Sequence, residues 1–511
     1  MAEEQHHDES SSSSVFLDYN FSIEALRRWI VAFVVCDFNV DVGVEVEYML
    51  PPTPEISTSD LSTICFNSFP ERNSDTVGDV EFHFRFRHSS SELVLEADHD
   101  KDAAYWYGFC LFRQQKDITV KRHFRQKSLV LISQHNYATL FRHLVKTVAL
   151  IDFDVSPTIV ESACANIASW NPPEIGHQEL PFLGSLLKVH IPPHVAFPLQ
   201  GLASPSMPSK LDLTLEHSKE IYTSEPLGSW AKLIALLPSP AELYVIFEQA
   251  LLCEPMVILA DEPSICSEFV SCVVDFIRPI PYSGDFRPYL TLQSDFFTNV
   301  DEGVSVQLAH TLTKFPGVTN PFFLKRLLQT QGKASNPAHV VYLAPKETRR
   351  NHQSRSFYPF TTDVELPPGF MPNETKGHIG KDWRFIKKLE EYLRGNEMSA
   401  RDCSDMIRRH FSILSALFLA PLNRYLATIL KTTNSSGISS YAPFSEDEFL
   451  ASLWKHGCYM GFKGKTGFHR HKNAEAFYRR FYRSKNFESW LGMKLEMRNA
   501  QDMQNGSREV E

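Results

Sequence analysis

The sequence predicts a chain of mixed α/β and all-α class, in which two α/β lobes precede a helical region. Three observations indicate this. The first third contains several strand patterns and then two helical stripes. The middle third alternates strand, helix and strand. Residues 345–490 read mostly as helix and hold 24 Lys and Arg against 15 Asp and Glu, whereas the whole chain of 511 residues carries −10.

The expected upstream lobe spans residues 26–170, after an acidic, Ser-rich tail over residues 1–25 that we expect to be disordered. Apolar and alternating runs predict strands at 29–36, 44–50, 80–87, 104–112 and 127–133. The first two should form a hairpin. The third alternates phenylalanines with charged residues such as His83 and Arg85, which predicts one solvent-facing side. Apolar stripes predict helices over 137–150 and 157–170.

The expected core lobe spans residues 181–330, after a Pro- and Gly-containing linker at 171–180. Strands are predicted at 184–191, 255–260 and 287–292, and helices at 238–254 and 263–277. The run at 255–260 is continuously apolar, as expected of a strand covered on both faces. Alternation of strands with helices favours a mostly parallel sheet.

The downstream region spans residues 381–492, after an irregular linker at 331–380 and before a tail at 493–511. Helices are predicted at 382–393, 400–431, 445–455 and 474–490. The most apolar stretch, 413–430, is interrupted by Pro421, Asn423 and Arg424, so a membrane span is not expected.

Composition excludes several classes of protein. The net charge of −10 gives the chain no general attraction to nucleic acid. Nine cysteines without any C-x-x-C spacing argue against a disulfide framework and against a Cys-rich zinc site. Reduced thiols in a cytosolic protein fit best, and the N-terminus lacks the features of a signal peptide.

Motifs for covalent chemistry are weak. Gly464-Lys465-Thr466 invites a phosphate-loop interpretation, but the position that requires the first glycine is Tyr459 and no strand precedes it. His469-x-His471 lacks a full set of metal ligands and is best interpreted as a solvated loop. The basic residues around both motifs suit contact with anionic lipid or a partner. We therefore expect no catalytic residue, cofactor, metal site or small-molecule substrate.

Two polar–aromatic clusters stand out, at 282–290 (YSGDFRPYL) and 317–323 (GVTNPFF). In the second, Thr319 or Asn320 could cap a helix that begins at Pro321. The simplest interpretation of both clusters is turns next to core aromatics.

Six segments, taken together and in order, resemble the DENN-domain proteins, most closely the DENN-domain-containing protein 6 subfamily. They are YGFCLFRQQKD (107–117), QKSLVLIS (126–133), GDFRPYLT (284–291), GVTNPFF (317–323), PLNRYLATIL (421–430) and FYRRFYRS (477–484). The resemblance covers about residues 28 to 490. The Ser-rich tail and residues 331–380 do not match a pattern of the family.

The resemblance implies a tripartite DENN architecture: a longin-like α/β lobe, a core α/β DENN lobe with a mostly parallel sheet, and a helical downstream region. It also implies a guanine-nucleotide exchange factor that promotes GDP release from a Rab GTPase, nucleotide-free or GDP-bound, in endosomal recycling. The expected location is the cytoplasm, with peripheral recruitment to recycling endosomes. Exchange acts without bond making, which agrees with the lack of catalytic motifs.

The sequence hypothesis places the GTPase against the cleft between the two lobes. Asp285, Phe286 and Arg287 would be its anchors, with Asn320 and Phe322 close by. The same residues could instead hold the core lobe together. A GTPase-binding adaptor or tether without exchange activity is the alternative function, and a hydrolase with a hidden site is the third.

Overall fold

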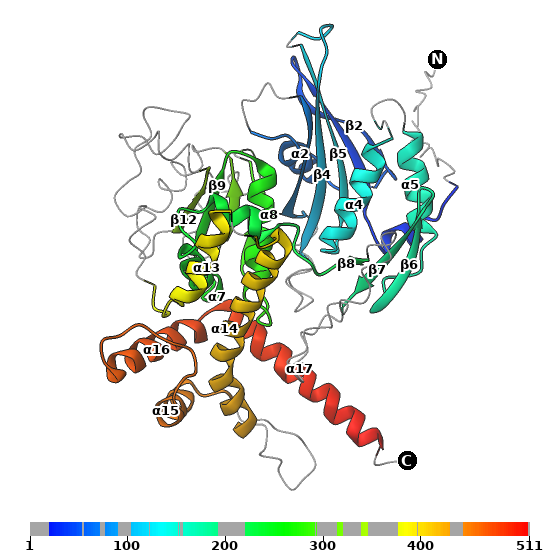
Figure 1. Ribbon diagram of the computed structural model, residues 1–511. Helices are drawn as coiled ribbons and strands as arrows, with labels where there is room; N and C mark the ends of the chain where they lie inside the picture. Colours follow the sequence, from blue (N-terminus) through cyan, green and yellow to red (C-terminus); the bar gives the residue numbers. More distant parts are fainter. Residues whose placement is uncertain are drawn as a thin grey trace, which may run out of the picture.

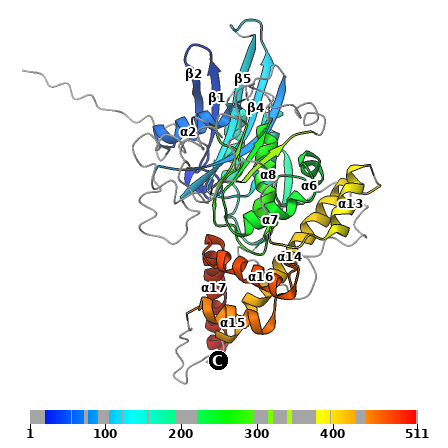
Figure 2. The same ribbon diagram turned by 90° about the vertical axis from the view of Figure 1, so that its left-hand side faces the viewer.

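The computed structural model confirms the mixed α/β and α class (Figure 1). It describes residues 20–53, 56–71, 77–89, 104–121, 123–151, 153, 157–192, 220–291, 293, 314–319, 339–345, 377–395, 397–429 and 443–508. Two α/β lobes lie side by side, and the helices of the last third extend away from them at one end (Figures 1 and 2).

A five-stranded antiparallel sheet forms the upstream lobe, in the order β2-β1-β5-β4-β3. Its strands are β1 (Ala32–Asn39), β2 (Gly43–Leu50), β3 (Gly78–Arg87), β4 (Tyr105–Lys116) and β5 (Phe124–Ser133). The predicted hairpin is confirmed: β1 begins with five buried residues, whereas β2 is mostly half-buried or exposed.

Helices cover both faces of this sheet. They are α1 (Ile23–Arg27), α2 (Thr58–Ser68), α4 (Ala138–Ala149) and α5 (Thr158–Ala168). Neighbouring residues of a strand point to opposite faces. Cys110 accordingly contacts the carbonyl of Ser68 on α2, while Phe109 packs on Phe141 of α4 with ring centroids 5.3 Å apart.

The predicted solvent-facing side of β3 is wrong. His83 and Arg85 are each only 3% exposed. β3 is the edge strand of its sheet, and helix α8 (Pro263–Phe276) and strand β10 (Asp285–Arg287) of the core lobe pack against it. The alternating pattern identified the strand correctly, but a second lobe covers the face that looked solvated.

A small three-stranded sheet follows the upstream lobe, in the order β6-β7-β8. Its strands are β6 (Gly176–Phe182), β7 (Ser185–Ile191) and β8 (Ile221–Tyr222). β6 begins inside the segment predicted as a linker, because its own apolar residues, Leu180 and Phe182, are buried.

The core lobe contains the predicted parallel sheet, in the order β10-β11-β9-β12. The remaining elements of this lobe are α6 (Trp230–Leu233), η2 (Ile234–Leu236), α7 (Glu242–Leu251), β9 (Met256–Ala260), β11 (Lys314–Val318) and β12 (His339–Leu343). All five residues of β9 are buried, as its continuous apolar run predicts. The strand predicted at 287–292 lies earlier, as β10. Strand β12 lies in the predicted linker at 331–380 and pairs with β9.

The downstream helices are α13 (Trp383–Leu393), α14 (Ala400–Ile429), α15 (Glu446–His456), α16 (Gly467–Tyr482) and α17 (Lys485–Arg508). The single helix predicted at 474–490 is two helices, α16 and α17. The chain turns at Ser484, whose hydroxyl accepts a hydrogen bond from the backbone N–H of Phe487 at 3.2 Å. Figure 2 shows α16 and α17 running in different directions from this turn.

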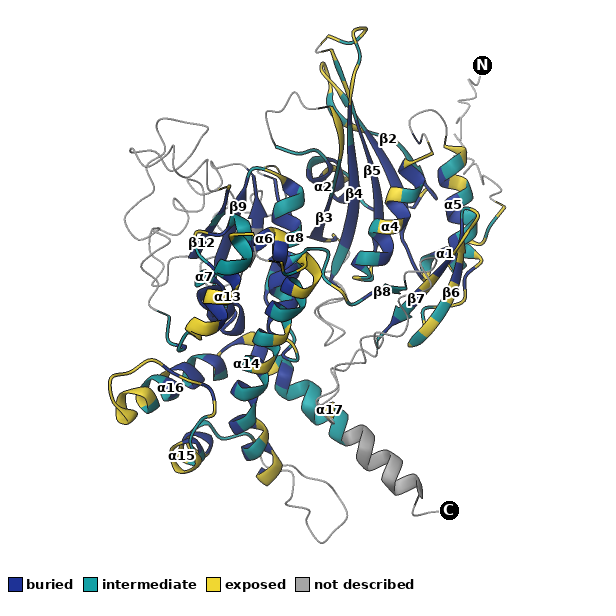
Figure 3. Ribbon diagram, viewed as in Figure 1, coloured by how far each residue is buried: buried dark blue, intermediate teal, exposed yellow. Residues whose placement is uncertain are grey.

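Among the described helices, α14 alone is long and apolar enough to cross a membrane by length and composition. Its 18-residue window has a mean hydropathy of 1.3. One side of the helix packs in the manner of a core helix (Figure 3). Phe411 packs on Phe276 of α8 with ring centroids 4.0 Å apart, and Phe418 stacks on Tyr478 of α16 at 4.6 Å.

Candidate functional site: the joint between the two lobes

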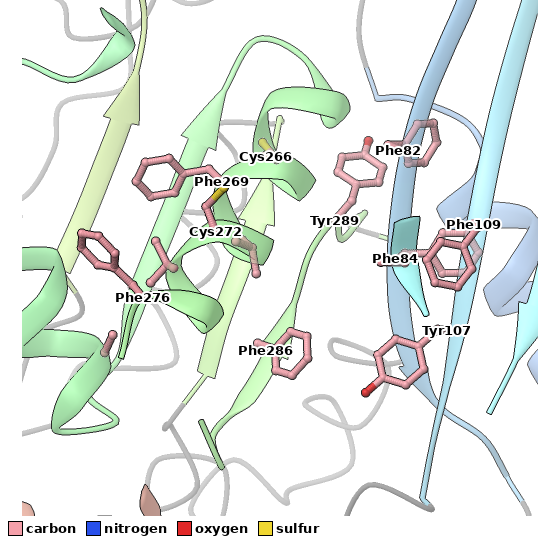
Figure 4. Packing of buried hydrophobic residues seen from close by; sticks show 14 of the residues in the cluster. Phe82, Phe84, Tyr107, Phe109, Cys266, Phe269, Cys272, Phe276, Phe286 and Tyr289 are labelled. Atoms are coloured by element: carbon pink, nitrogen blue, oxygen red, sulfur yellow. The ribbon is translucent and has the colours of Figure 1, made fainter. Parts of the chain in front are cut away.

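The GDFRPYL segment lies where the core lobe meets β3 of the upstream lobe (Figure 4). Asp285, Phe286 and Arg287 form β10, an edge strand of the parallel sheet. Arg287 donates a hydrogen bond from Nε to Asp285 Oδ1 at 2.8 Å, because side chains two apart on a strand share a face. Phe286 is 7% exposed and Arg287 4%, so both side chains are almost fully covered.

A buried arginine of the upstream lobe, Arg85, lies against the aromatic rings of this joint. Its guanidinium carbon is 4.3 Å from the centroid of the Phe286 ring and 3.8 Å from that of Tyr105. Its carbonyl accepts a hydrogen bond from Arg287 Nη1 at 3.1 Å. A cation over an aromatic face is attracted to it, and the attraction grows when water is excluded. Arg85 therefore connects the two lobes through both its side chain and its backbone.

A second set of contacts lies around Tyr289, which is fully buried. Its hydroxyl accepts a hydrogen bond from the backbone N–H of Glu71 at 2.9 Å, and its ring meets Phe82 of β3 edge-on at 5.1 Å. Thr319, at the end of β11, donates from its hydroxyl to the carbonyl of Glu71 at 3.2 Å. Residues of both sequence clusters thus form hydrogen bonds with the backbone of Glu71, in the upstream lobe.

Two glycines of these clusters permit close approach. A Cβ on Gly317 would lie 2.3 Å from the carbonyl oxygen of Pro288, and one on Gly284 would lie 2.7 Å from the sulfur of Cys253. Both distances are too short for non-bonded atoms, so any larger residue would displace the segments that meet there. Here the glycines serve packing within the core lobe.

The joint also reaches the downstream helices. The side-chain oxygen of Asn486, on α17, accepts a hydrogen bond from the backbone N–H of Ser283 at 2.8 Å. Its amide nitrogen donates to the carbonyls of Ala250 and Leu251, at 2.8 and 3.0 Å. Asn486 is fully buried. One side chain therefore joins the end of α7, the segment before β10 and the start of α17.

A small pocket lies farther along the contact between the lobes. It is lined by Glu81, Phe82, His83, Phe109, Cys110, Arg142, Val145, Leu227, Ser267 and Glu268. Burial opposes ionisation of Glu81, but hydrogen bonds from Arg142 at 2.7 Å and Lys146 at 2.9 Å outweigh it and lower its pKa. Burial, with a smaller effect of the Arg142 charge, lowers the pKa of His83 to about 3, so this imidazole is neutral at pH 7.

Two buried thiols at the joint are not activated for covalent chemistry. Burial raises the pKa of the Cys110 and Cys266 thiols, which keeps both protonated and poorly nucleophilic. The arrangement supplies packing, cation–aromatic contacts and hydrogen bonds. These can fix how two lobes sit relative to each other, and thereby shape a surface that spans them.

Some residues of the joint were predicted from the sequence, and others were not. Asp285, Phe286 and Arg287 form strand β10, whereas Asn320 and Phe322 lie outside the described residues. Arg85 and Asn486 were missed. Arg85 carried only the signal of a charge among phenylalanines, and nothing in the sequence around Asn486 indicates its contacts. Whether any of these residues touches a GTPase stays a prediction.

The Gly464-Lys465-Thr466 motif lies away from the joint, in an exposed loop before α16. Thr466 is the N-cap of that helix and accepts a hydrogen bond from the backbone N–H of His469 at 3.2 Å. His469 is exposed and its ring contacts the Thr466 hydroxyl. These contacts agree with the interpretation of the motif as a polar loop between helices.

Comparison with known proteins gives long, continuous similarities. Protein DENND6A of Gallus gallus is 29% identical over 496 residues, which cover 92% of this chain and 79% of the relative. Protein DENND6B of Homo sapiens is 28% identical over 509 residues, covering 92% and 80%. The DENND6 homolog of Dictyostelium discoideum is 26% identical over 523 residues, covering 91% and 70%. No family model matches the chain.

Proposed function

Because the chain belongs to the DENND6 subfamily of DENN-domain proteins, we propose that it is a guanine-nucleotide exchange factor for a Rab GTPase. The observation that carries the proposal is the similarity over about nine-tenths of the chain. In the same terms, we assign the upstream lobe as longin-like, the parallel-sheet lobe as the core DENN lobe, and α13 to α17 as the downstream DENN region. The interlobe joint supports this assignment, because it makes one continuous body of the two lobes.

The proposed activity is a change of binding equilibria. A GTPase holds its nucleotide through a phosphate loop, Mg²⁺ and ordered switch loops. An exchange factor that binds the switches in a geometry incompatible with Mg²⁺ weakens nucleotide binding, and nucleotide weakens the exchange factor by the same factor. Three to five decades of faster release require about 4–7 kcal/mol of barrier lowering, at about 1.4 kcal/mol per decade.

We place the GTPase across the two lobes, on the surface whose shape the joint fixes. Under the sequence hypothesis Asp285, Phe286 and Arg287 would contact it directly. The burial of Phe286 and Arg287 favours a positioning role for these two instead, since side chains that are 7% and 4% exposed offer little surface to a partner. Substitution distinguishes the two roles. Loss of a direct contact with the GTPase lowers the rate of GDP release without lowering the free energy of unfolding, whereas loss of a positioning contact lowers both.

The proposal is tested by the release of fluorescent GDP from a panel of purified Rab GTPases, with and without the full chain. We expect at least one Rab to release GDP about 10³-fold faster or more. That Rab should also bind the chain most tightly when it is nucleotide-free. Acceleration of no Rab, together with tighter binding to a GTP-loaded Rab, would instead establish the adaptor or tether function.

We further propose that the chain works in the cytoplasm and is recruited peripherally to recycling endosomes. An exposed, basic stretch of chain over α15, α16 and the loop between them, here called the basic patch, supports recruitment to a membrane. It comprises the exposed residues Trp454, Lys455, Tyr459, Lys463, Lys465, Phe468, Arg470 and Lys472. No acidic residue occurs between Glu448 and Glu475. Each Lys or Arg close to an anionic leaflet contributes about 1 kcal/mol of attraction, and exposed aromatics suit the membrane interface.

A further inference from the structure

The small sheet β6-β7-β8 brings together three side chains that could bind metal and that are distant in sequence. His177 on β6 and His190 on β7 are direct partners in the antiparallel register. Tyr222 on β8 is in turn the partner of His190. Glu220 precedes Tyr222 by two residues, so it shares the sheet face of Tyr222 and of the two histidines. Strand pairing therefore gathers two imidazoles and one carboxylate on one face.

The side chains converge closely. One ligand atom from each of His177, His190 and Glu220 lies within 4.8 Å of the other two. The imidazole rings of His177 and His190 have centroids 4.5 Å apart. His177 Nδ1 forms a hydrogen bond with Glu220 Oε1. The other carboxylate oxygen, Oε2, accepts a hydrogen bond from the Tyr222 hydroxyl at 3.0 Å.

Two details go beyond a simple His–Glu ion pair. Nδ1 of His190 is shielded from solvent and has no hydrogen-bond partner among the described residues, although a buried ring nitrogen normally has one. The Tyr222 hydroxyl holds the carboxylate by the oxygen that does not face His177. Such an outer hydrogen bond is what orients a carboxylate ligand toward a metal ion.

We propose that His177, His190 and Glu220 bind a zinc ion, with water in the fourth position. Two imidazoles and one carboxylate are a ligand set typical of Zn²⁺, whereas Ca²⁺ and Mg²⁺ prefer oxygen ligands alone. Ligand atoms around tetrahedral zinc are about 3.4 Å apart, given bonds of about 2.0–2.1 Å. The ligand atoms here are up to 4.8 Å apart. Side-chain rotations that bring them about 1.4 Å closer together would give the tetrahedral spacing.

The site ties down a short strand. β8 has only two residues, Ile221 and Tyr222. The backbone N–H of Thr223 donates to the carbonyl of His190 at 3.1 Å, and the Thr139 hydroxyl of α4 donates to the carbonyl of Tyr222 at 2.7 Å. A zinc ion would add a link from Glu220 to both strands of the β6–β7 hairpin, just where the chain enters the core lobe.

This inference does not depend on exchange activity, and it differs from the expectation, drawn from sequence, that the chain holds no metal site. The strand pairing supplies what the sequence does not, because 43 positions separate His177 from Glu220 in the chain and a hydrogen bond between His177 Nδ1 and Glu220 Oε1 joins them in the fold. The test is therefore one of metal binding alone.

The experiment uses the full chain, stripped of metal with a chelator and then titrated with Zn²⁺ against a chromophoric chelator at pH 7.5. Binding of Co²⁺, followed by its visible d–d absorption, reports the coordination number. The matched variants are His177→Ala, His190→Ala and Glu220→Gln. The control is the double variant His469→Ala/His471→Ala, which removes two histidines from the first two turns of α16.

We expect one equivalent of Zn²⁺ to bind the wild type and the control equally tightly, with a four-coordinate Co²⁺ spectrum. Each ligand variant should bind at least about 100-fold more weakly, and Tyr222→Phe about tenfold more weakly, as for loss of an outer partner. Saturating Zn²⁺ should raise the melting temperature of the wild type and leave the ligand variants unchanged.

The proposal fails if the wild type binds Zn²⁺ no more tightly than His177→Ala, or if the control loses binding and the ligand variants keep it. Circular dichroism of each metal-free variant checks folding. If His190→Ala does not fold, His190→Gln replaces it, and retained tight binding by that variant also overturns the proposal.

Discussion

At the scale of the residue, Phe286 is a buried side chain at the joint between the lobes, and its proposed role in exchange can be separated from its role in stability. Phe286 is buried, and the guanidinium carbon of Arg85 lies 4.3 Å from the centroid of its ring. Tyr282 packs beside the same ring. Removing the ring would leave a cavity and would take an aromatic face away from a buried cation. The same change would alter the angle between the lobes.

We expect Phe286→Ala to lower the free energy of unfolding by about 3–5 kcal/mol, as for truncation of a buried phenylalanine. Chemical denaturation measures this. The control is Phe468→Ala, at an exposed phenylalanine of α16, which should change stability by less than about 0.5 kcal/mol. If Phe286→Ala slows GDP release while stability is unchanged, Phe286 is a direct GTPase contact and its positioning role is wrong.

His83 introduces sensitivity to acid. Its pKa is about 3 in the folded chain, because burial and the Arg142 charge disfavour the imidazolium, whereas an unfolded histidine has a pKa of about 6.5. The unfolded state therefore binds a proton first as pH falls. The contribution of neutral His83 to the free energy of unfolding is fully present above about pH 6.5 and is lost progressively between pH 6.5 and pH 3.

Between pH 7 and pH 5, we expect the free energy of unfolding of the wild type to fall by about 2 kcal/mol more than that of His83→Gln, because the unfolded wild type takes up one additional proton. Urea midpoints at the two pH values measure the difference. His339→Gln provides a parallel case, since burial lowers the pKa of that histidine to about 4. Identical pH dependence of the wild type and both variants would show that these imidazoles are solvated.

At the scale of the element, α17 depends on one buried amide. Asn486 makes three hydrogen bonds to backbone groups of the core lobe. Substitution by Ala would leave one N–H and two carbonyls without this partner inside the protein, and buried groups that lose their partner cost about 1–3 kcal/mol.

We expect Asn486→Ala to lower the free energy of unfolding by about 2–3 kcal/mol and to increase protease cleavage of α17. The matched control is Asn473→Ala on α16, whose amide makes an exposed hydrogen bond to the carbonyl of Lys463 at 2.7 Å. The control should cost less than about 1 kcal/mol. Equal losses in the two variants would contradict a special role of Asn486.

The loop and helix of the basic patch supply the second prediction at this scale. We expect Lys463→Glu/Lys465→Glu to reduce binding to phosphatidylserine vesicles by about 30-fold or more at 0.1 M salt, from about 1 kcal/mol per charge. The control, Lys387→Glu/Lys388→Glu, makes the same charge change on the exposed side of α13.

Sedimentation with vesicles measures both variants. Equal losses in the two would show that net charge alone sets membrane binding, and binding of wild type to neutral vesicles would exclude an electrostatic mechanism. Binding of an acidic protein but of no vesicle would assign the basic patch to a protein partner.

At the scale of the whole molecule, the three parts meet in one region. Arg85 of the upstream lobe, Arg287 of the core lobe and Asn486 of α17 all lie at the joint or next to it. A GTPase bound across two lobes would experience any change in their relative orientation. This favours a rigid joint, because binding energy used to order a loose one would not be available to displace nucleotide.

Sequence alone determined the class of each lobe, since alternation along β3 and the apolar run of β9 are local patterns with a fixed period. It also indicated the similarity to the DENND6 proteins, because the matching segments are contiguous stretches of chain. Strand β12 was missed, since a run of four apolar residues after His339 gives too short a signal, and pairing with β9 stabilises this strand.

The tertiary structure alone decided which polar residues meet. His83 and Arg85 look solvated in sequence because alternation reports two faces of a strand but not what covers them. Asp285 and Arg287 look like exposed anchors for the same reason. The register of β6, β7 and β8 brings His177 and Glu220 together from 43 positions apart, and no local period encodes that distance. Burial and pairing are properties of the assembled lobes, so they become visible only when those lobes are in place.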